Sequence, residues 1–392
     1  MFIDKLFNKV SFIFSKKPLI YLLSLFFIWR VSLLLLAFLG PSLIPVWGDR
    51  FPYVQEQLVF SKLPYWLWSW GNFDGVHYLT IAKTFYSAYY TQTFFPFYPL
   101  LVRIFAKTIF FNNFLVSGLF ISNISFILCL YFFRKLFILD GYKNYLSWIF
   151  IFLLLFPTSF YFGSIYSESL FLMLIIGSLY LARQNKWFYS IIFGIIASAT
   201  RLMGIFILPA LIYEYVLQNR KKTRLTRILP FFLIPLGLVS YMVYLKIKFA
   251  DPLLFWHVQP VFGAQRLGSG IILPPQVIYR YIKIFLSVNI SSLAFLNAFF
   301  EFFMFILGII LLVRAHRLKV RLSYLIFSWP CLILPSLTGT LSSMPRYILI
   351  CFPIFIVLGI IRNKFIKLLI LLFSFCLLSL STILFTRGYW VG

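Results

Sequence analysis

Long apolar runs separated by short polar connections recur along most of this chain of 392 residues. A helix that crosses a bilayer needs roughly 20 mainly apolar residues. Runs of this character lie at residues 19–40, 113–133, 145–163, 167–184, 187–200, 202–217, 228–247, 296–313, 322–340, 346–361 and 366–385. The pattern predicts an all-α polytopic membrane protein with about 11 transmembrane helices, with 187–217 as one broken helix in an alternative reading.

The first apolar run follows a lysine-rich head over residues 1–17 and ends in LGPS. A cleaved signal peptide has a shorter apolar core and a small-residue cleavage site. We therefore expect an uncleaved signal anchor. The basic head puts the N-terminus in the cytoplasm.

Residues 41–111 differ from the rest because they combine acidic residues with a dense set of Trp and Tyr. Such aromatic residues favour the interface between membrane and water. We expect a large first extracytoplasmic loop with interfacial helices in GVHYLTIAKTFY and FPFYPLLVRIFAKTIF. The alternative, a short span in the second stretch, would invert the topology of everything downstream. Residues 112–392 then form the remaining transmembrane bundle of a single integral membrane domain, 1–392.

Charge follows the same pattern along the chain. Only 11% of the residues are charged and 62% are hydrophobic, which excludes a water-soluble globule. The formal net charge is +26, and basic residues cluster on alternate connections, at 134–143, 183–186, 220–227, 314–321 and 362–367. This asymmetry fits the positive-inside rule, with the C-terminus outside. The charge forms no continuous stripe, so nucleic acid is not an expected partner.

The candidate chemistry is limited by a total of nine acidic residues. Asp4 and Asp140 fall on the cytoplasmic side, Glu214 is expected to pair with the basic cluster at 220–227, and Glu301 lies within a span. The acids expected outside are Asp49, Glu56, Asp74, Glu168 and Asp251. Any extracytoplasmic acid–base residue belongs to this second group. No Gly-rich phosphate loop, HExxH or GxSxG motif occurs.

Asp74 stands out because it lies in the aromatic stretch WLWSWGNFDGVHYLTIAKTFY. One interpretation is a helix N-cap, in which the carboxylate accepts backbone N–H groups and stabilises the helix by about 1 kcal/mol. The other is a catalytic carboxylate at the mouth of an aromatic cleft, with His77 three residues on and on the same helical face. The two roles are compatible in one residue.

Further candidates lie at the outer ends of predicted spans. Glu168, in FPTSFYFGSIYSESLF, either caps and solvates an outer turn or contributes to a site. Arg201, in ASATRLMGIFILP, and Arg346, in LSSMPRYILICFP, each either extend to the lipid headgroups or bind an anion. Two arginines at this level, with the adjacent Tyr347, suit a phosphate head group. His257, in DPLLFWHVQPVFGAQR, is expected to be interfacial and not catalytic.

These segments together resemble a known family. The order FDGVHYLTIA, FFPFYPLLVR, YSESLF, ATRLMGIFILP, DPLLFWHVQ and SMPRYILICFP is similar to that of the PIG-V-type mannosyltransferases (GPI mannosyltransferase II and its bacterial relatives) of the GT-C glycosyltransferase superfamily. The resemblance covers residues 65–361. It implies a GT-C-like enzyme whose donor is a polyprenyl-phosphate sugar, typically mannose. The family's catalytic acid falls on Asp74, and this chain has Phe73 where the family usually has Trp.

The resemblance also gives expected roles to the other candidates. Glu168, Arg201 and Arg346 fall on the family's Ser-Glu turn and outer-face arginines, and with His77 and Tyr347 they are expected to bind the substrate or the donor phosphate. A lipid-phosphate donor already carries a good leaving group, so one base suffices and a single displacement inverts the anomeric centre. Arginines stabilise the charge on the departing phosphate. The scarcity of acids argues against a divalent-metal site, so no metal and no cofactor are expected.

The expected function is therefore an inverting glycosyltransferase. It would move a sugar, mannose in the first instance, from a polyprenyl-phosphate donor to a lipid- or envelope-linked glycan acceptor. The site would face the extracytoplasmic or lumenal side of the bacterial plasma membrane or the eukaryotic endoplasmic reticulum. The alternative is a transporter or flippase of lipid-linked sugars, which should carry ionisable residues near the membrane midplane, where only Arg30 and Glu301 qualify. A non-catalytic scaffold is disfavoured by the acid in the aromatic loop.

Overall fold

The computed structural model describes residues 17–48, 51–219, 224–264 and 266–391, and within these ranges the chain forms helices and no strand. The predicted all-α class is confirmed. Asp4, Asp49, most of the lysine-rich head and residues 220–223 of one basic cluster lie outside the described residues.

Four helices of the described chain are long and apolar enough to cross a membrane. They are α2 (Pro18–Leu43), α7 (Phe114–Leu139), α15 (Leu293–Arg317) and α19 (Lys364–Thr386). Residues Leu225–Leu233 and helix α12 (Leu236–Phe249) are bent by 41° and together make a fifth candidate. By length and composition the described chain therefore has four or five candidate spans, and about 11 spans stays a prediction.

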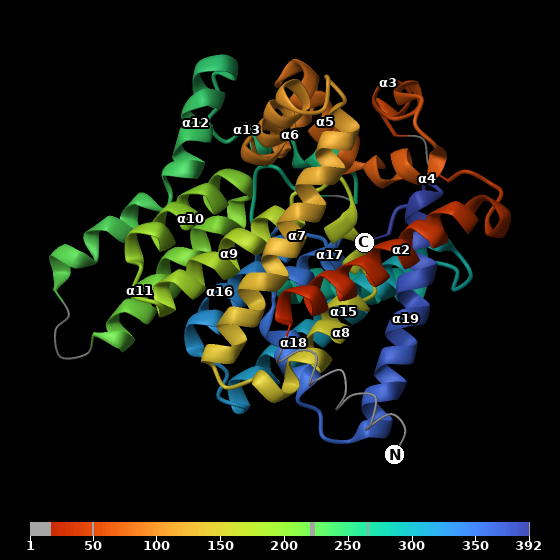
Figure 1. The fold of residues 1–392 in the computed structure, drawn as a ribbon. Helices are drawn as coiled ribbons and strands as arrows, with labels where there is room; N and C mark the ends of the chain where they lie inside the picture. The colour runs from red at the N-terminus through yellow and green to blue at the C-terminus, as the bar shows by residue number, and fades with distance from the viewer. Residues whose placement is uncertain (1–16, 49–50, 220–223, 265, 392) are drawn as a thin grey trace.

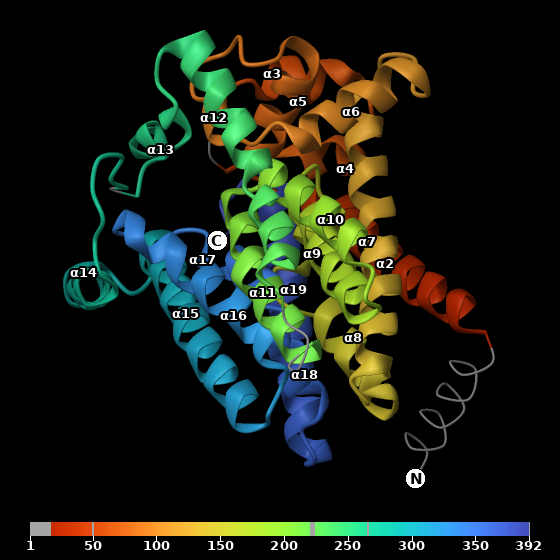
Figure 2. The same cartoon turned by 90° about the vertical axis from the view of Figure 1, so that its left-hand side faces the viewer.

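The remaining apolar runs form shorter helices packed among the long ones (Figures 1 and 2). These are α8 (Leu146–Leu154), α9 (Glu168–Arg183), α10 (Trp187–Thr200), α11 (Ile207–Gln218), α16 (Leu322–Ile333) and α18 (Pro353–Gly359). Helix α8 ends shortly before Pro157, which restricts the residue before it to extended conformations. This break limits the helix formed by the apolar run 145–163 to nine residues.

The region 187–217 forms two helices that reverse direction at Arg201. Arg201 is extended, with φ −155° and ψ 148°, and the short 3₁₀ helix η6 (Leu202–Phe206) follows it. At Gly204 a Cβ atom would lie 2.4 Å from the backbone of Ala197, so the tight reversal requires glycine there. The turn leaves Arg201 at its tip.

Residues 51–111 gather at one end of the bundle in both views (Figures 1 and 2). Their helices are α3 (Val54–Gln57), α4 (Tyr65–Trp68), α5 (Asp74–Thr84) and α6 (Phe97–Thr108). Helices α5 and α6 occupy the two stretches expected to be helical. With 12 residues α6 is about 18 Å long, well short of the roughly 30 Å hydrocarbon core.

Two segments from the second half of the chain approach α5. One contains α13 (Leu254–His257) and α14 (Pro274–Ser287), and the other contains α17 (Met344–Tyr347). The C-terminal residues also reach the centre of the molecule, where the hydroxyl of Tyr161 donates to the carbonyl of Val391 at 2.6 Å. Segments far apart in sequence therefore meet beside α5.

An ionic cluster lies at the C-terminal end of α9. Arg183, the last residue of that helix, pairs with Asp140 and lies 3.6 Å from Glu214. Glu214 also accepts from Nε of Arg321 at 2.7 Å. The expected pairing of Glu214 with the 220–227 cluster is therefore wrong for the described residues, because α11 packs against α9 and α16 and turns this carboxylate toward Arg321.

Two exposed positions provide a test of topology. Tyr89 lies at the end of the bundle that holds α5, and Lys143 lies at the end that holds Asp140. We expect Tyr89→Cys to react with a membrane-impermeant maleimide in intact cells, and Lys143→Cys to react only after permeabilisation. The labelling of the wild-type chain, which has four cysteines of its own, is subtracted as background. Labelling of both positions from the same side would contradict the placement of the two ends across a bilayer.

Candidate functional site

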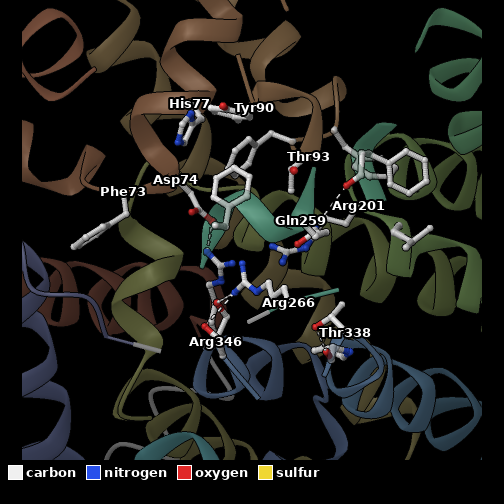
Figure 3. A pocket seen from close by; sticks show the side chains of 18 of the residues that line it. Phe73, Asp74, His77, Tyr90, Thr93, Arg201, Gln259, Arg266, Thr338 and Arg346 are labelled. Carbon is white, nitrogen blue, oxygen red and sulfur yellow. Dashed lines mark hydrogen bonds and ion pairs between the residues drawn. The ribbon is translucent and has the colours of Figure 1, made fainter. Parts of the chain in front are cut away.

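A cavity of about 530 Å³ lies between α5, the Arg201 turn, the α13 segment and the α17 segment (Figure 3). Its wall is largely aromatic, with Phe73, Phe94, Phe262 and Trp390 among the lining residues. The charged side chains that reach it are Asp74, Arg201, Arg266 and Arg346. A mainly apolar cavity with a few convergent charged groups is the usual form of a small-molecule site.

Asp74 is positioned by an unusual backbone at the start of α5. Phe73, immediately before it, has φ 58° and ψ −115°, which costs a residue with a side chain about 1–3 kcal/mol. The hydroxyl of Tyr166 holds this turn, since it accepts from the Asp74 backbone N–H at 3.2 Å and donates to the Asn72 carbonyl at 2.9 Å. Asn72 in turn donates to the carbonyl of Phe385 at 2.8 Å.

The N-cap interpretation of Asp74 is wrong. Asp74 is the first residue of α5, Phe73 occupies the cap position, and the helix has no side-chain cap hydrogen bond. The Asp74 carboxylate instead forms an ion pair with Nη1 of Arg346, 272 residues further along the chain (Figure 3). The carboxylate therefore faces the cavity, as the second interpretation requires.

Two carboxylates and two guanidinium groups form one chain of charges. Arg346 pairs with Asp74 on one side, and its Nε lies 3.3 Å from Oε1 of Glu168 on the other. The same Oε1 accepts from Nη1 of Arg201 at 2.6 Å. The sequence candidates Asp74, Glu168, Arg201 and Arg346 are thus brought together by α5, α9, the α10–η6 turn and α17.

The two carboxylates differ in access. The side chain of Glu168 is fully buried, whereas that of Asp74 is 16% exposed and lines the cavity. Glu168 lies at the first residue of α9, where the helix dipole favours a negative charge. Its contacts with both arginines make it their structural counter-ion, and Asp74 is left as the carboxylate that a ligand can reach.

Tyr347 lies between the two arginines. Its ring is 5.5 Å from the guanidinium of Arg201 and 5.6 Å from that of Arg346. Tyr161 and Tyr166 also lie within 5.6 Å of Arg346. Cation–π contacts of this kind are attractive where the groups are removed from water. They stabilise a guanidinium whose exposure is only 7%.

His77 lies on the cavity wall one turn after Asp74. Its ring stacks on Phe94 with centroids 4.9 Å apart, and Tyr53 and Phe262 contact it edge-on. Burial lowers the pKa of His77 to about 4, and the nearby charge of Asp74 opposes this shift only in part. His77 is therefore neutral at pH 7, with its buried Nδ1 free of hydrogen-bond partners in the described structure.

Arg266 is a cavity residue that the sequence analysis missed. Its Nη2 donates to the hydroxyl of Ser342 at 3.1 Å and reaches that of Ser343 at 3.5 Å. Arg266 lies in a connection without helical periodicity, and its basic side chain among apolar residues was the only available signal. His257, nine residues earlier, pairs with Asp251 at 2.6 Å and does not line the cavity.

The other acidic residues of the described chain stand apart from the cavity. Glu301 accepts from the hydroxyl of Tyr281 at 2.5 Å, and Glu56 is exposed. Within the described ranges, no three His, Cys, Asp or Glu side chains are grouped closely enough to hold a metal ion. Arg30, in α2, lies 4.3 Å over the ring of Trp70 and is not among the lining residues.

Comparison with known proteins adds no relative: no protein-family profile, no curated protein and no solved structure matches this chain. The chemistry of the site is therefore inferred from its own residues and geometry.

Removal of the Glu168 charge tests the role of that carboxylate as counter-ion. We expect Glu168→Gln to lower the free energy of unfolding by about 3–5 kcal/mol, because the buried guanidinium of Arg346 and the largely buried one of Arg201 lose a shared partner. The thermal midpoint of the detergent-solubilised protein measures this change. Glu56→Gln, at an exposed position, serves as the matched control and should leave the midpoint nearly unchanged. Equal midpoints for Glu168→Gln and wild type would refute the assignment.

The pKa of His77 predicts a dependence of stability on pH. The unfolded chain binds a proton near pH 6.5 and the folded chain only near pH 4, so stability falls as the pH drops below about 6.5. This group alone accounts for a loss of roughly 2 kcal/mol between pH 7 and pH 5. We expect His77→Phe, which keeps an aromatic ring but cannot titrate, to show a smaller fall in thermal midpoint over that interval. An unchanged fall would mean that the pKa of His77 is not lowered in the folded protein.

Proposed function

We propose that this protein is an inverting glycosyltransferase that uses a polyprenyl-phosphate sugar as donor. The observation that carries the proposal is the Asp74 carboxylate, held at the start of α5 and open to an aromatic cavity that three guanidinium groups also reach. A carboxylate suits the deprotonation of a hydroxyl, and guanidinium groups suit a phosphate. Aromatic walls provide flat apolar surface for a sugar ring and a lipid.

The proposed reaction needs one base. The Asp74 carboxylate takes the proton of the acceptor hydroxyl. At the same time the oxygen of that hydroxyl attacks the anomeric carbon from the side opposite the phosphate. The bond from that carbon to the phosphate oxygen breaks, and its electron pair leaves with the phosphate, where arginines stabilise the charge. A single displacement of this kind inverts the anomeric centre.

The geometry favours transfer over hydrolysis of an ordinary glycoside. Glycosidases use two carboxyl groups that both reach the substrate, one of them to protonate the leaving oxygen. Glu168 is the second carboxylate nearby, but it is fully buried and paired with Arg201 and Arg346. A phosphate leaving group removes the need for such an acid.

The resemblance to PIG-V-type mannosyltransferases is part of the proposal. Its segments FDGVHYLTIA, YSESLF, ATRLMGIFILP and SMPRYILICFP are widely separated in sequence, yet each supplies one member of the charge network. Convergence of these segments supports the inference that they form one site. We propose mannose as the sugar and a lipid- or envelope-linked glycan as the acceptor.

In the proposed topology the shorter apolar helices also cross the membrane, which gives about 11 spans. The cavity then lies on the extracytoplasmic or lumenal side. What supports it is the separation of two polar clusters along one helix. The charge network begins at Glu168 and the second ionic cluster contains Arg183, so the 16 residues of α9 separate them by about 24 Å. Basic residues follow at the Arg183 end, as expected of a cytoplasmic face. The membrane proposed is the bacterial plasma membrane or the endoplasmic reticulum.

Substitution of Asp74 tests the function directly. We expect Asp74→Asn to lower sugar transfer by at least 10²–10⁴-fold, because the amide cannot accept the proton, while the protein stays folded. The assay uses purified protein in detergent with radiolabelled polyprenyl-phosphate mannose, glucose and arabinose, in the presence of EDTA because the proposed reaction uses no metal.

Asp251→Asn is the matched control, since Asp251 is an outer carboxylate that does not line the cavity, and it should keep full transfer. Near-wild-type turnover in Asp74→Asn would remove this residue as the base. Movement of the lipid-linked sugar across the membrane of vesicles that contain the protein, without transfer of the sugar to an acceptor, would favour the flippase alternative.

A further inference from the structure

Arg266 differs from the other two arginines of the cavity in its partners. Arg201 and Arg346 each pair with Glu168, and Arg346 also pairs with Asp74. Among the described residues, no carboxylate lies within ion-pair distance of the Arg266 guanidinium. Glu301 acts on it electrostatically, but the Glu301 carboxylate is bonded to Tyr281 at 2.5 Å. The unneutralised positive charge of the cavity is therefore centred on Arg266.

The position of Arg266 next to the Arg346 segment is a second observation. Both arginines line the cavity (Figure 3), and Ser343 contacts both, since Nη2 of Arg266 lies 3.5 Å from its hydroxyl and its carbonyl accepts from the Arg346 backbone N–H at 3.0 Å. Two guanidinium groups that line one cavity repel each other unless an anion lies between them. A phosphate satisfies both, because each guanidinium presents a fork of N–H donors that matches its oxygens.

Serine hydroxyl groups line the same place. Ser342 and Ser343 accept hydrogen bonds from Nη2 of Arg266 and can donate their own protons to an anion. Ser343 is buried, with 1% of its surface exposed. Its φ of 70° is a left-handed backbone conformation that few residues with a side chain adopt. These contacts use only Nη2, so as far as the described residues show, the other donor nitrogens of Arg266 are open to a ligand.

The backbone around Arg266 is held in place. The N–H of Leu267 donates to the carbonyl of Thr338 at 2.9 Å, and that of Ile272 donates to the carbonyl of Leu337 at 3.0 Å. Ile271 and Leu273, on the same segment, are 70% and 65% exposed. An apolar surface next to a phosphate site suits a ligand that joins a phosphate to a hydrocarbon chain better than it suits a free phosphate.

We propose that Arg266, with the hydroxyls of Ser342 and Ser343, anchors the phosphate of a lipid phosphate whose chain leaves across the segment 267–273. This assignment rests on the proposed function in that the lipid phosphate is the sugar donor. It gives the three arginines different tasks: Arg266 receives the phosphate, Arg346 spans the space between that phosphate and Asp74, and Arg201 balances Glu168.

A binding experiment on the full-length protein in detergent tests the anchor without any sugar transfer. The probes are farnesyl phosphate, farnesol and inorganic phosphate, and the readout is a thermal-shift titration checked by native mass spectrometry. We expect farnesyl phosphate to bind wild type at least tenfold more tightly than Arg266→Gln, which keeps the length of the side chain and loses its charge. Lys283→Ala, which removes an exposed positive charge on α14, should bind like wild type.

Each other outcome overturns a defined part of the inference. Equal affinity of wild type and Arg266→Gln for farnesyl phosphate would exclude Arg266 as the anchor. If the glutamine variant has a much lower thermal midpoint than wild type, Arg266→Lys provides a second variant. Inorganic phosphate that binds as tightly as farnesyl phosphate would mean a free-anion site. Farnesol that binds equally well would exclude phosphate recognition.

The donor dependence of transfer separates this inference from the proposed function. If Arg266→Gln raises the donor KM at least tenfold with a smaller change in kcat, both stand. Arg266-dependent binding with no transfer from any donor would leave the anchor and refute the transferase. Asp74-dependent transfer with an unchanged donor KM in Arg266→Gln would support the transferase and refute the anchor.

Discussion

The buried charge network is the constraint on which the rest of the site depends. Ionised groups cannot be taken out of water unless they are paired; the Glu168 side chain is fully buried, and those of Arg346 and Arg201 are only 8% and 12% exposed. Their pairing fixes α9, the α10–η6 turn and α17 relative to one another, and the ion pair to Asp74 adds α5. The position of the reachable carboxylate follows from the neutralisation of charges behind it.

A second set of contacts fixes the orientation of that carboxylate. The strained backbone of Phe73 persists because Tyr166 bonds both sides of the turn, and the Phe73 ring lies 4.6 Å from Phe51 and 5.1 Å from Trp390. The Asn72 side chain ties the same turn to the end of α19. A side chain held this firmly suits electrostatic preorganisation, in which the protein does not have to rearrange as charge develops. Residues between Phe51 and Phe95 thus form part of the cavity wall.

The two ends of the bundle carry polar clusters of different character. The cluster of Asp140, Arg183, Glu214 and Arg321 makes direct ion pairs and hydrogen bonds among its own members, while the cavity end keeps one carboxylate and the Arg266 guanidinium accessible. Internally satisfied polar clusters stabilise a fold, and incompletely satisfied ones mark where a ligand contributes the missing partner. The difference between the two ends separates ion pairs that are closed among themselves from those that border an open cavity.

The amino-acid sequence alone determined the all-α class, the unusual region 41–111 and the short set of acids from which Asp74 was chosen, because composition and apolar periodicity are local properties. It also indicated Arg201 and Arg346, since charged residues among apolar ones are conspicuous in any window. Only the tertiary structure decided that Asp74 pairs with Arg346 and does not cap its helix, that Glu214 pairs with Arg321, and that Arg266 belongs to the cavity. These facts depend on contacts between residues up to 272 positions apart, and on backbone breaks that shorten apolar runs into helices below span length. Hydropathy records how apolar a stretch is, whereas the site depends on which helix ends the packing brings together.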